Sequence, residues 1–238
     1  MRTGPPIRTQ SLEPTIFIID DSQQCRESAG ALAQSVGLRY EEFSSAEQFL
    51  ASFMALRPGC VLVDFHLRGM NGFELQLLIA ELDASLPVII ISAHIDVPFA
   101  VMAMEKGAYS VLEKPCGYDC LCDTLRSALE QNQQTRAAHQ ERAARRMGFD
   151  QLDEREREVA EMLLNGLPNK AMATRLDISP RTLNRVRTSL LRKMKADTVV
   201  ELVRTLMKLR LDELGDEKAA RPSIVRSPHF RIGAGSRQ

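Results

Sequence analysis

The stretch Cys60-Val61-Leu62-Val63-Asp64 decides the fold class, because it is a short apolar run that ends in a carboxylate. Three further apolar runs also lead to polar residues: 16–19 to Asp20-Asp21, 87–91 to Ser92, and 109–112 to Lys114. Helical patterns separate these runs, and residues 39–43 make a plausible edge strand. Such alternation is typical of an α/β fold with a doubly wound parallel sheet, here of five strands.

The polar residues at the strand ends are expected to meet, because parallel strands place their carboxyl ends at one edge of a sheet. Asp20, Asp21 and Asp64 would then repel one another, by about 4 kcal/mol for each pair of unit charges 4 Å apart at an effective dielectric constant near 20. A divalent cation removes this conflict. Mg²⁺ suits the site because it needs few protein carboxylates and can also hold a phosphoryl oxygen. The sequence therefore favours phosphoryl chemistry with Mg²⁺ as cofactor.

Five motifs follow one another in this half of the chain: Asp20-Asp21, Asp64, Gly69-Met70-Asn71-Gly72, Ser92-Ala93-His94 and Glu113-Lys114-Pro115. In order and spacing they resemble the receiver domain of two-component response regulators, a flavodoxin-like fold. The resemblance implies that a sensor histidine kinase is a partner and that Asp64 attacks its phosphohistidine to become an acyl phosphate. It also implies that Asp20, Asp21, Asp64 and the backbone carbonyl of His66 hold Mg²⁺.

Lys114 suits such a site on chemical grounds, because its ammonium can pair with the charge of a phosphoryl group. Ser92 offers a hydroxyl at the same edge. The resemblance implies that this hydroxyl moves toward the phosphate and that the ring of Tyr109 rotates inward with it. The resemblance also implies a cis bond between Lys114 and Pro115, which costs only about 0.5–1 kcal/mol before proline.

Simpler explanations remain open for single members of this set. The pair Asp21-Ser22 could cap a helix over residues 23–36. Ser92 could be an ordinary strand-end hydroxyl, and Tyr109 could fill the core. It is the occurrence of all of them together with Asp64 that favours the receiver.

Arg68 departs from the receiver pattern, because the family usually has proline four residues after the phosphoacceptor. The loop beside the site would be less rigid, since proline fixes φ and arginine does not. Arg68 keeps open an alternative, a DNA-binding regulator whose receiver does not depend on phosphorylation. A phosphatase of the haloacid dehalogenase class is a second alternative, but it would carry aspartate where this chain has His66. We therefore predict a regulator and not an enzyme.

Composition supports two domains with different partners. The chain has 238 residues, 44% of them hydrophobic, and a formal net charge of zero. Residues 1–130 hold 9 Lys and Arg against 17 Asp and Glu, a charge of −8, whereas residues 131–238 hold 22 against 14, a charge of +8. This asymmetry indicates an acidic metal-binding half and a half with a polyanionic partner.

All five cysteines lie in the acidic half, where reduced thiols are the default expectation. Cys116, Cys120 and Cys122 are close in sequence but form no CxxC pair, so structural cysteine is favoured over a metal site. His66 and His94 are isolated and are not expected to be metal ligands. The chain starts without an apolar signal core and has no stretch long enough to span a membrane, so a cytoplasmic protein is predicted.

Composition changes along the chain predict the domain boundaries. The expected segments are a flexible N-terminus at 1–11, the receiver at 12–130, a partly helical linker at 131–148, a smaller all-α domain at 149–212 and a disordered tail at 213–238. The linker is rich in Gln, Ala and Arg. Its arginines are interpreted as a solvated face in preference to a DNA contact.

The second domain shows the capping signals of several short helices. Asp153 and Glu156 make a capping-box-like start, and Ser179-Pro180 begins a third helix that runs to about residue 194. In this third helix Leu183, Val186, Leu190 and Met194 form one apolar stripe. The opposite side carries Arg181, Asn184, Arg185, Thr188 and Arg192, side chains that suit base edges and phosphates in DNA.

Residues 152–206 resemble LuxR-type four-helix HTH domains, on the motifs Glu154-Arg155-Glu156-Arg157-Glu158-Val159, Gly166-Leu167-Pro168-Asn169-Lys170 and Ile178-Ser179-Pro180-Arg181-Thr182-Leu183. With the receiver, the likeness is to the FixJ/NarL group. The expected DNA-contact residues are Lys170, Arg181, Thr182, Asn184, Arg185, Arg187, Thr188 and Arg192, with Lys193 and Lys195 as further phosphate contacts. Val186 stands where the family often has histidine. Double-stranded DNA, a second copy of the phosphorylated chain and RNA polymerase are the expected partners.

Overall fold

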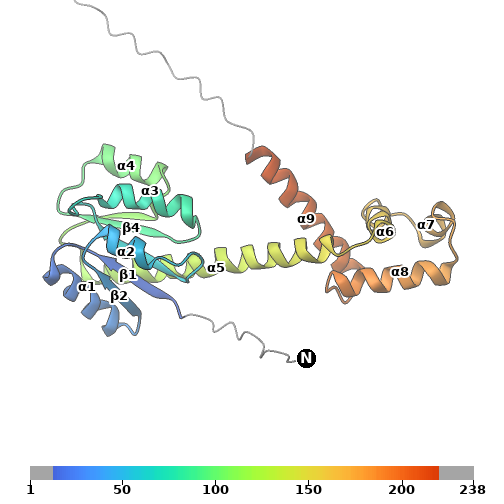
Figure 1. Ribbon diagram of the computed structural model, residues 1–238, viewed down its shortest axis with the longest axis horizontal. Coiled ribbons are helices and arrows are strands. Elements are labelled where there is room, and N and C mark those ends of the chain that lie inside the picture. Colours follow the sequence, from blue (N-terminus) through green and yellow to red (C-terminus); the bar gives the residue numbers. More distant parts are fainter. Residues whose placement is uncertain (1–12, 220–238) are drawn as a thin grey trace, which may run out of the picture. The chain divides into compact units, whose positions relative to one another are not determined.

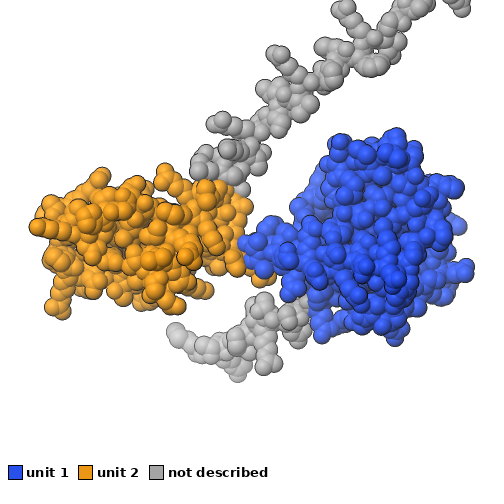
Figure 2. Space-filling model, turned by 180° about the vertical axis from the view of Figure 1, so that it is seen from behind, with its two compact units in different colours: residues 1–139 blue, residues 140–238 orange. Residues whose placement is uncertain are grey.

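The fold is described from a computed structural model, which covers residues 13–219. The predicted flexible N-terminus and the tail from residue 220 onward lie outside the described residues. The chain divides into two compact units, with the boundary between His139 and Gln140 (Figure 2). Among the described helices, none has both the length and the apolar character needed to cross a membrane.

The first unit contains a five-stranded sheet in the order β2-β1-β3-β4-β5. Its strands are β1 (Thr15–Ile19), β2 (Arg39–Phe43), β3 (Gly59–Asp64), β4 (Val88–Ser92) and β5 (Ser110–Glu113). Every neighbouring pair is parallel. The predicted doubly wound sheet is confirmed, and the strand that ends in Asp64 lies at its centre.

Helices cover both faces of this sheet (Figure 1). They are α1 (Gln23–Ser35), α2 (Ala46–Ser52), α3 (Gly72–Leu82), α4 (Val97–Glu105) and α5 (Tyr118–Asp150). Side chains of the central strands alternate between two cores, as the two-residue period of a strand requires. Val61 and Val63 pack with α2 and α3 residues such as Phe49 and Leu75, whereas Leu62 packs with α1 and α5.

Two capping residues fix where the helices beside the site begin. Ser22 is the N-cap of α1, so the cap predicted at Asp21-Ser22 belongs to the serine, and the aspartates before it serve another purpose. Asn71 caps α3 in a capping box with Glu74. Gly72 follows at a place with no room for a side chain, because a Cβ there would stand 2.3 Å from the Asp64 carbonyl oxygen.

The α5 helix differs from the predicted linker, because it continues without a break through residues 131–148. Its continuation is anchored on the first unit. Asn132, only 1% exposed, accepts hydrogen bonds from the backbone of Gly59 (3.0 Å) and donates to the Ser85 carbonyl. Arg136 donates to the Arg57 carbonyl (2.6 Å) and to Asp83 (3.1 Å). These polar contacts, which we call the α5 clasp, lie at the end of the sheet opposite Asp64.

We expect Asn132→Ala to destabilise the first unit by about 2–4 kcal/mol, because it leaves the Gly59 N–H and the Ser85 carbonyl buried without partners. The matched control is Gln133→Ala on the exposed side of the same helix. Tyrosine fluorescence during urea unfolding reports this unit alone, since all three tyrosines lie before residue 139 and the chain has no tryptophan. If the two variants unfolded at the same urea concentration, the α5 clasp would not contribute to the stability of the first unit.

The clasp also predicts how stability changes with pH. Burial would raise the pKa of Asp83, but hydrogen bonds from Ser85 and Leu56 and the charge of Arg136 outweigh it and hold that pKa below its usual value. A carboxyl group with a lowered folded pKa adds stability above its unfolded pKa, about 3.9, and loses it as pH falls through the folded pKa. We therefore expect Asp83→Asn to flatten the acid side of the stability profile in the same urea experiment.

The second unit is helical, with α6 (Glu154–Leu164), α7 (Asn169–Arg175), α8 (Pro180–Lys193) and α9 (Val199–Ala219). The capping box of Asp153 and Glu156 and the N-cap at Ser179 are confirmed. Leu183, Leu190 and Met194 of the predicted stripe are buried in the core of this unit, and Val186 packs against it.

The tail predicted from residue 213 is wrong over its first residues, because α9 continues to Ala219. The predicted tail was inferred from the loss of apolar periodicity. Adding residues to a helix that already exists is much easier than starting a new one. Leu202, Leu206 and Leu209 anchor α9 in the core, so the helix can extend beyond its last packed turn.

Candidate functional site

Two buried carboxylates from different strands share one lysine at the carboxyl edge of the sheet. Lys114 Nζ lies 2.7 Å from Asp20 Oδ2 and 2.7 Å from Asp64 Oδ1. Asp20 follows β1, Asp64 ends β3 and Lys114 follows β5, so residues 94 positions apart meet at one point. Asp20 is 3% and Asp64 6% exposed. The predicted convergence of strand ends is therefore present in the structure.

Backbone groups hold each carboxylate in place. Asp20 Oδ1 accepts a hydrogen bond from the backbone N–H of Ser22 at 2.9 Å, and Asp64 Oδ2 accepts one from that of His66 at 2.9 Å. Arg26 of α1 donates to the Asp20 carbonyl at 2.6 Å. One oxygen of each carboxylate is thus oriented by the loop that follows it, and the other faces Lys114.

Lys114 is held as a cation. Burial by itself would lower its pKa, but the hydrogen bonds to Asp20 and Asp64 and the charges of these carboxylates outweigh burial and raise the pKa above its usual value. The peptide bond between Lys114 and Pro115 is cis, as the resemblance implied. The backbone N–H of Lys114 donates to the Ser92 carbonyl at 2.7 Å, which ties the lysine to the end of β4.

Asp21 forms its ion pair with a different cation from the one that Asp20 and Asp64 share. Its Oδ2 atom is 3.3 Å from Nε of Arg68, the residue that departs from the family pattern. Within residues 13–219, no three His, Cys, Asp or Glu side chains are grouped as ligands of one ion. The structure therefore brings two of the three predicted carboxylates together through Lys114 and turns the third toward an arginine.

Ser92 ends β4 at the carboxyl edge of the sheet. Tyr109 instead precedes β5, and its N–H donates to the Val88 carbonyl at the start of β4, so the structure places it at the opposite edge from Ser92 and the expectation that it lies beside the site is wrong. The Ser92 side chain is fully buried, and its hydroxyl donates to the His94 carbonyl at 3.0 Å while accepting from the His94 N–H at 3.3 Å. Tyr109 is half-buried against the core that α1 and α5 cover. In this structure the hydroxyl is thus engaged with its own loop, and Tyr109 packs as a core residue would.

The histidines and cysteines are not arranged for metal binding in the described residues. His66 and His94 are exposed on separate loops. Cys122 is buried, Cys116 is half-buried and Cys120 is exposed, and the five cysteines form no disulfide. Burial raises the pKa of the Cys60 thiol to about 12, so that thiol stays protonated at neutral pH.

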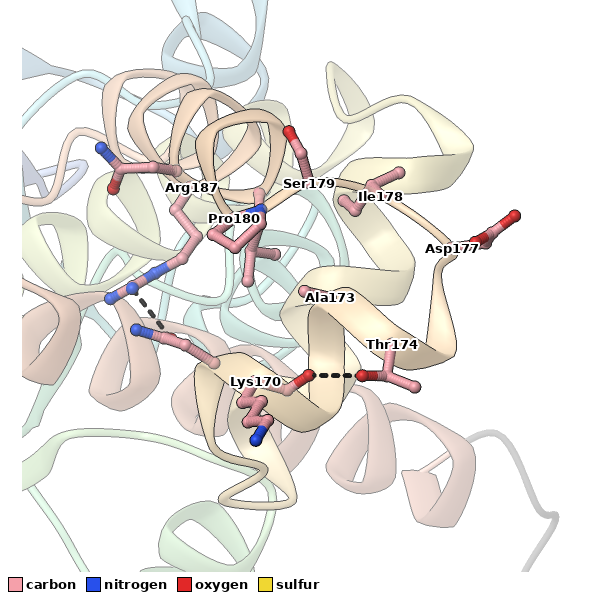
Figure 3. Close-up of a pocket in the computed structure, with 11 residues that line it drawn as sticks. Lys170, Ala173, Thr174, Asp177, Ile178, Ser179, Pro180 and Arg187 are labelled. Carbon is pink, nitrogen blue, oxygen red and sulfur yellow. Dashed lines mark hydrogen bonds between the residues drawn. The ribbon is translucent and has the colours of Figure 1, made fainter.

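The second unit presents the candidate nucleic-acid interface on α8. Arg181, Asn184, Arg185, Thr188 and Arg192 are all exposed on the side opposite the buried stripe. A pocket of about 820 Å³ lies between α7 and the start of α8, with Lys170, Thr174, Ser179 and Pro180 among its lining residues (Figure 3). Exposed cations and hydrogen-bonding groups thus share one surface, as contacts to bases and phosphates require.

Two predicted phosphate contacts, Lys193 and Arg187, have side-chain partners inside the unit. Lys193 Nζ lies 2.6 Å from Oε2 of Glu156, a carboxylate only 3% exposed. Burial would raise the pKa of Glu156, but the hydrogen bonds from Lys193 and the backbone of Asp153 outweigh it and lower that pKa. Arg187 donates to Asn169 Oδ1 at 2.9 Å (Figure 3). Lys193 is therefore a structural residue that joins α8 to α6.

Asn169 has a role that its local sequence does not indicate. It lies at the start of α7, and its hydrogen bond orients the guanidinium of Arg187 across the two helices. Nothing in the local pattern could have revealed this pairing, because the residues are 18 positions apart and on different helices. Asn132 and Arg136 were missed for the same reason, since their partners lie in other elements.

Comparison with known proteins agrees with both halves of this description. Residues 16–126 match the family model of the response regulator receiver domain, and residues 150–206 match that of the bacterial regulatory proteins of the luxR family. The transcriptional regulatory protein FixJ of Bradyrhizobium diazoefficiens is 38% identical over 196 residues, 81% of this chain and 94% of FixJ. The response regulator protein TmoT of Ectopseudomonas mendocina is 35% identical over 198 residues, 83% of this chain and 90% of TmoT.

Two solved structures of response regulators align with most of this chain. The response regulator StyR, known at low resolution, aligns with a TM-score of 0.76 and 32% identity over 82% of this chain and 99% of StyR. Full-length FixJ aligns with a TM-score of 0.51 and 36% identity over 83% of this chain and 98% of FixJ. The chain therefore belongs to the two-component response regulators that join a receiver to a LuxR-type DNA-binding domain. The resemblance to the FixJ/NarL group inferred from the sequence is confirmed.

Proposed function

We propose that a sensor histidine kinase switches this regulator by phosphorylating Asp64, and that the phosphorylated form pairs to bind DNA. The observation that carries the proposal is the shared lysine: Asp64 Oδ1 and Asp20 Oδ2 both lie 2.7 Å from Lys114 Nζ. A carboxylate fixed at a strand end, beside a permanent cation, is suited to receive a phosphoryl group.

The residues present fit Mg²⁺, because two buried carboxylates already share one cation and this ion needs only one or two of them. Asp20, Asp64 and the His66 carbonyl would hold it, with Asp21 after release from Arg68. When bound, Mg²⁺ neutralises charge on the phosphoryl oxygens.

In the transfer itself, an oxygen of Asp64 forms a bond to phosphorus as the phosphohistidine P–N bond breaks. The electron pair of that bond stays on the imidazole nitrogen, and Asp64 becomes an acyl phosphate. Lys114 would then pair with the phosphoryl oxygens in place of the lost carboxylate charge. We propose that Ser92 exchanges its contact with His94 for one to the phosphate.

On the DNA side, we propose that α8 is the recognition helix. Arginine suits guanine O6/N7 and asparagine suits adenine N6/N7, so Arg181, Asn184 and Arg185 are the candidate base readers. Lys170, Thr182, Arg187, Thr188 and Arg192 are the candidate residues for positioning on the backbone. Two copies would read half-sites about 34–36 Å apart. RNA polymerase is a further candidate partner at such a site, and the proposed location is the cytoplasm.

The experiment that tests this function measures phosphorylation and its consequence in one sample. The full chain is incubated with acetyl phosphate, with Mg²⁺ or with EDTA, and then examined by intact mass, oligomeric state and DNA affinity. We expect one phosphoryl group and tighter DNA binding with Mg²⁺, and neither with EDTA. Equal DNA affinity of the modified and unmodified protein would favour the alternative, a regulator that does not depend on phosphorylation.

A further inference from the structure

Each of the three carboxylates at the proposed Mg²⁺ site already contacts a cation of the protein. Asp20 and Asp64 share Lys114, and Asp21 pairs with Arg68 at 3.3 Å. The Arg68 side chain is 93% exposed and that of Asp21 30%. This second ion pair is therefore close to solvent and can open without disturbing the core.

Arg68 changes the charge that an arriving metal ion meets. Three carboxylates against two protein cations leave the site with a formal charge of −1, whereas an uncharged residue at position 68 would leave it at −2. Mg²⁺ binding at Asp21 also requires Arg68 to leave that carboxylate. Both effects oppose the metal, since like charges repel and the ion pair must be broken.

We propose that Arg68 is a built-in competitor of Mg²⁺ at Asp21 and so sets the metal affinity of the receiver. This inference rests on the proposed function of the site and deepens it. The receiver would need a higher Mg²⁺ concentration to become competent for phosphorylation, because the arginine occupies one carboxylate until the metal displaces it.

The loop that carries Arg68 is held by other residues, so a change at position 68 alters charge more than loop structure. The backbone N–H of Met70 donates to Glu47 at 3.1 Å, and that of Gly72 donates to the Phe65 carbonyl at 3.0 Å. Gly69 takes a positive φ of 83°, which glycine adopts without strain. None of these contacts uses the Arg68 side chain.

The test is a calorimetric titration of the full chain with Mg²⁺ alone. We expect Arg68→Gln to bind Mg²⁺ about fivefold more tightly at low salt, which is the upper range for an exposed ion pair. Arg68→Lys keeps the charge and should stay near wild type. Arg126→Gln, at an exposed position of α5, removes the same charge elsewhere and should leave the affinity unchanged.

Salt separates competition by charge from a change in loop rigidity. The gain of Arg68→Gln should shrink in 1 M NaCl, where the Debye length falls to about 3 Å from about 10 Å at 0.1 M. Equal affinities of wild type and Arg68→Gln at low salt, or a gain that persists in high salt, would overturn the inference and leave the proposed function standing. If no variant binds Mg²⁺, the metal site of the proposed function fails, and this inference fails with it.

Discussion

Asp64→Asn is expected to abolish phosphorylation of the chain by a kinase or by acetyl phosphate. The amide keeps the size of the side chain but has no carboxylate oxygen to form a bond to phosphorus. The neighbouring Asp20 keeps its contacts with Lys114 and the Ser22 N–H in this variant, so the rest of the site is retained. Intact mass after incubation with Mg²⁺ and acetyl phosphate measures the result directly.

The matched control for this variant is Asp123→Asn, an exposed carboxylate on α5 in the same unit. It loses the same charge and should gain one phosphoryl group as wild type does. Phosphorylation of Asp64→Asn at the wild-type level would identify a different nucleophile and sink the assignment of Asp64. Loss in both variants would point to a general effect of charge on the receiver.

Replacing Arg181, Arg185 and Arg192 together by alanine is expected to weaken binding to duplexes of random sequence more than tenfold. All three are exposed on α8 and none has a structural partner to lose among the described contacts. The slope of log affinity against log salt should fall by about 0.9 for each phosphate contact removed, so the loss of Arg192, the proposed backbone contact of the three, should lower it by about that amount. Fluorescence anisotropy over a series of salt concentrations gives both quantities.

The matched control removes three exposed cations from other helices of the same unit, namely Arg155, Arg204 and Lys208. That variant has the same net charge, so it should lose affinity only through the general field of the protein. An equal loss in both variants would mean that α8 has no special place in DNA binding. Asn184→Ala offers a finer readout, since a base reader should change which sequences are selected from a random pool.

How far the sequence predicted the fold can be seen in its strands and caps. The strand predicted at residues 39–43 is β2 as observed, and the run that ends in Asp64 is the central strand β3. Hydrophobic runs predict such elements well because a strand covered on both faces must be apolar throughout. The helices extend further than predicted at residues 131–148, which were expected to be only partly helical, and at residues 213–219, which were expected to be a tail. Both segments are rich in polar helix formers, whose pattern does not show where a helix ends.

The candidate site, too, was predicted from the sequence only in part. The sequence indicated that Asp20, Asp64, Ser92 and Lys114 meet, because strand ends in a parallel sheet have only one edge to share. It could not indicate that Asp21 turns to Arg68 or that Arg187 is oriented by Asn169. Side-chain pairing across elements depends on distances of a few ångströms, and periodicity carries no information at that scale.

By itself, then, the sequence determined the class of fold, the two domains and the residue types at the site, because all of these follow from local patterns of burial and charge. Only the tertiary structure decided which cation pairs with which carboxylate. It also decided that Lys193 pairs with the buried Glu156 inside the unit. The same holds for the fastening of α5 to the receiver by Asn132 and Arg136. These outcomes depend on which elements become neighbours, and the energy of an ion pair or a buried hydrogen bond exists only once they are in contact.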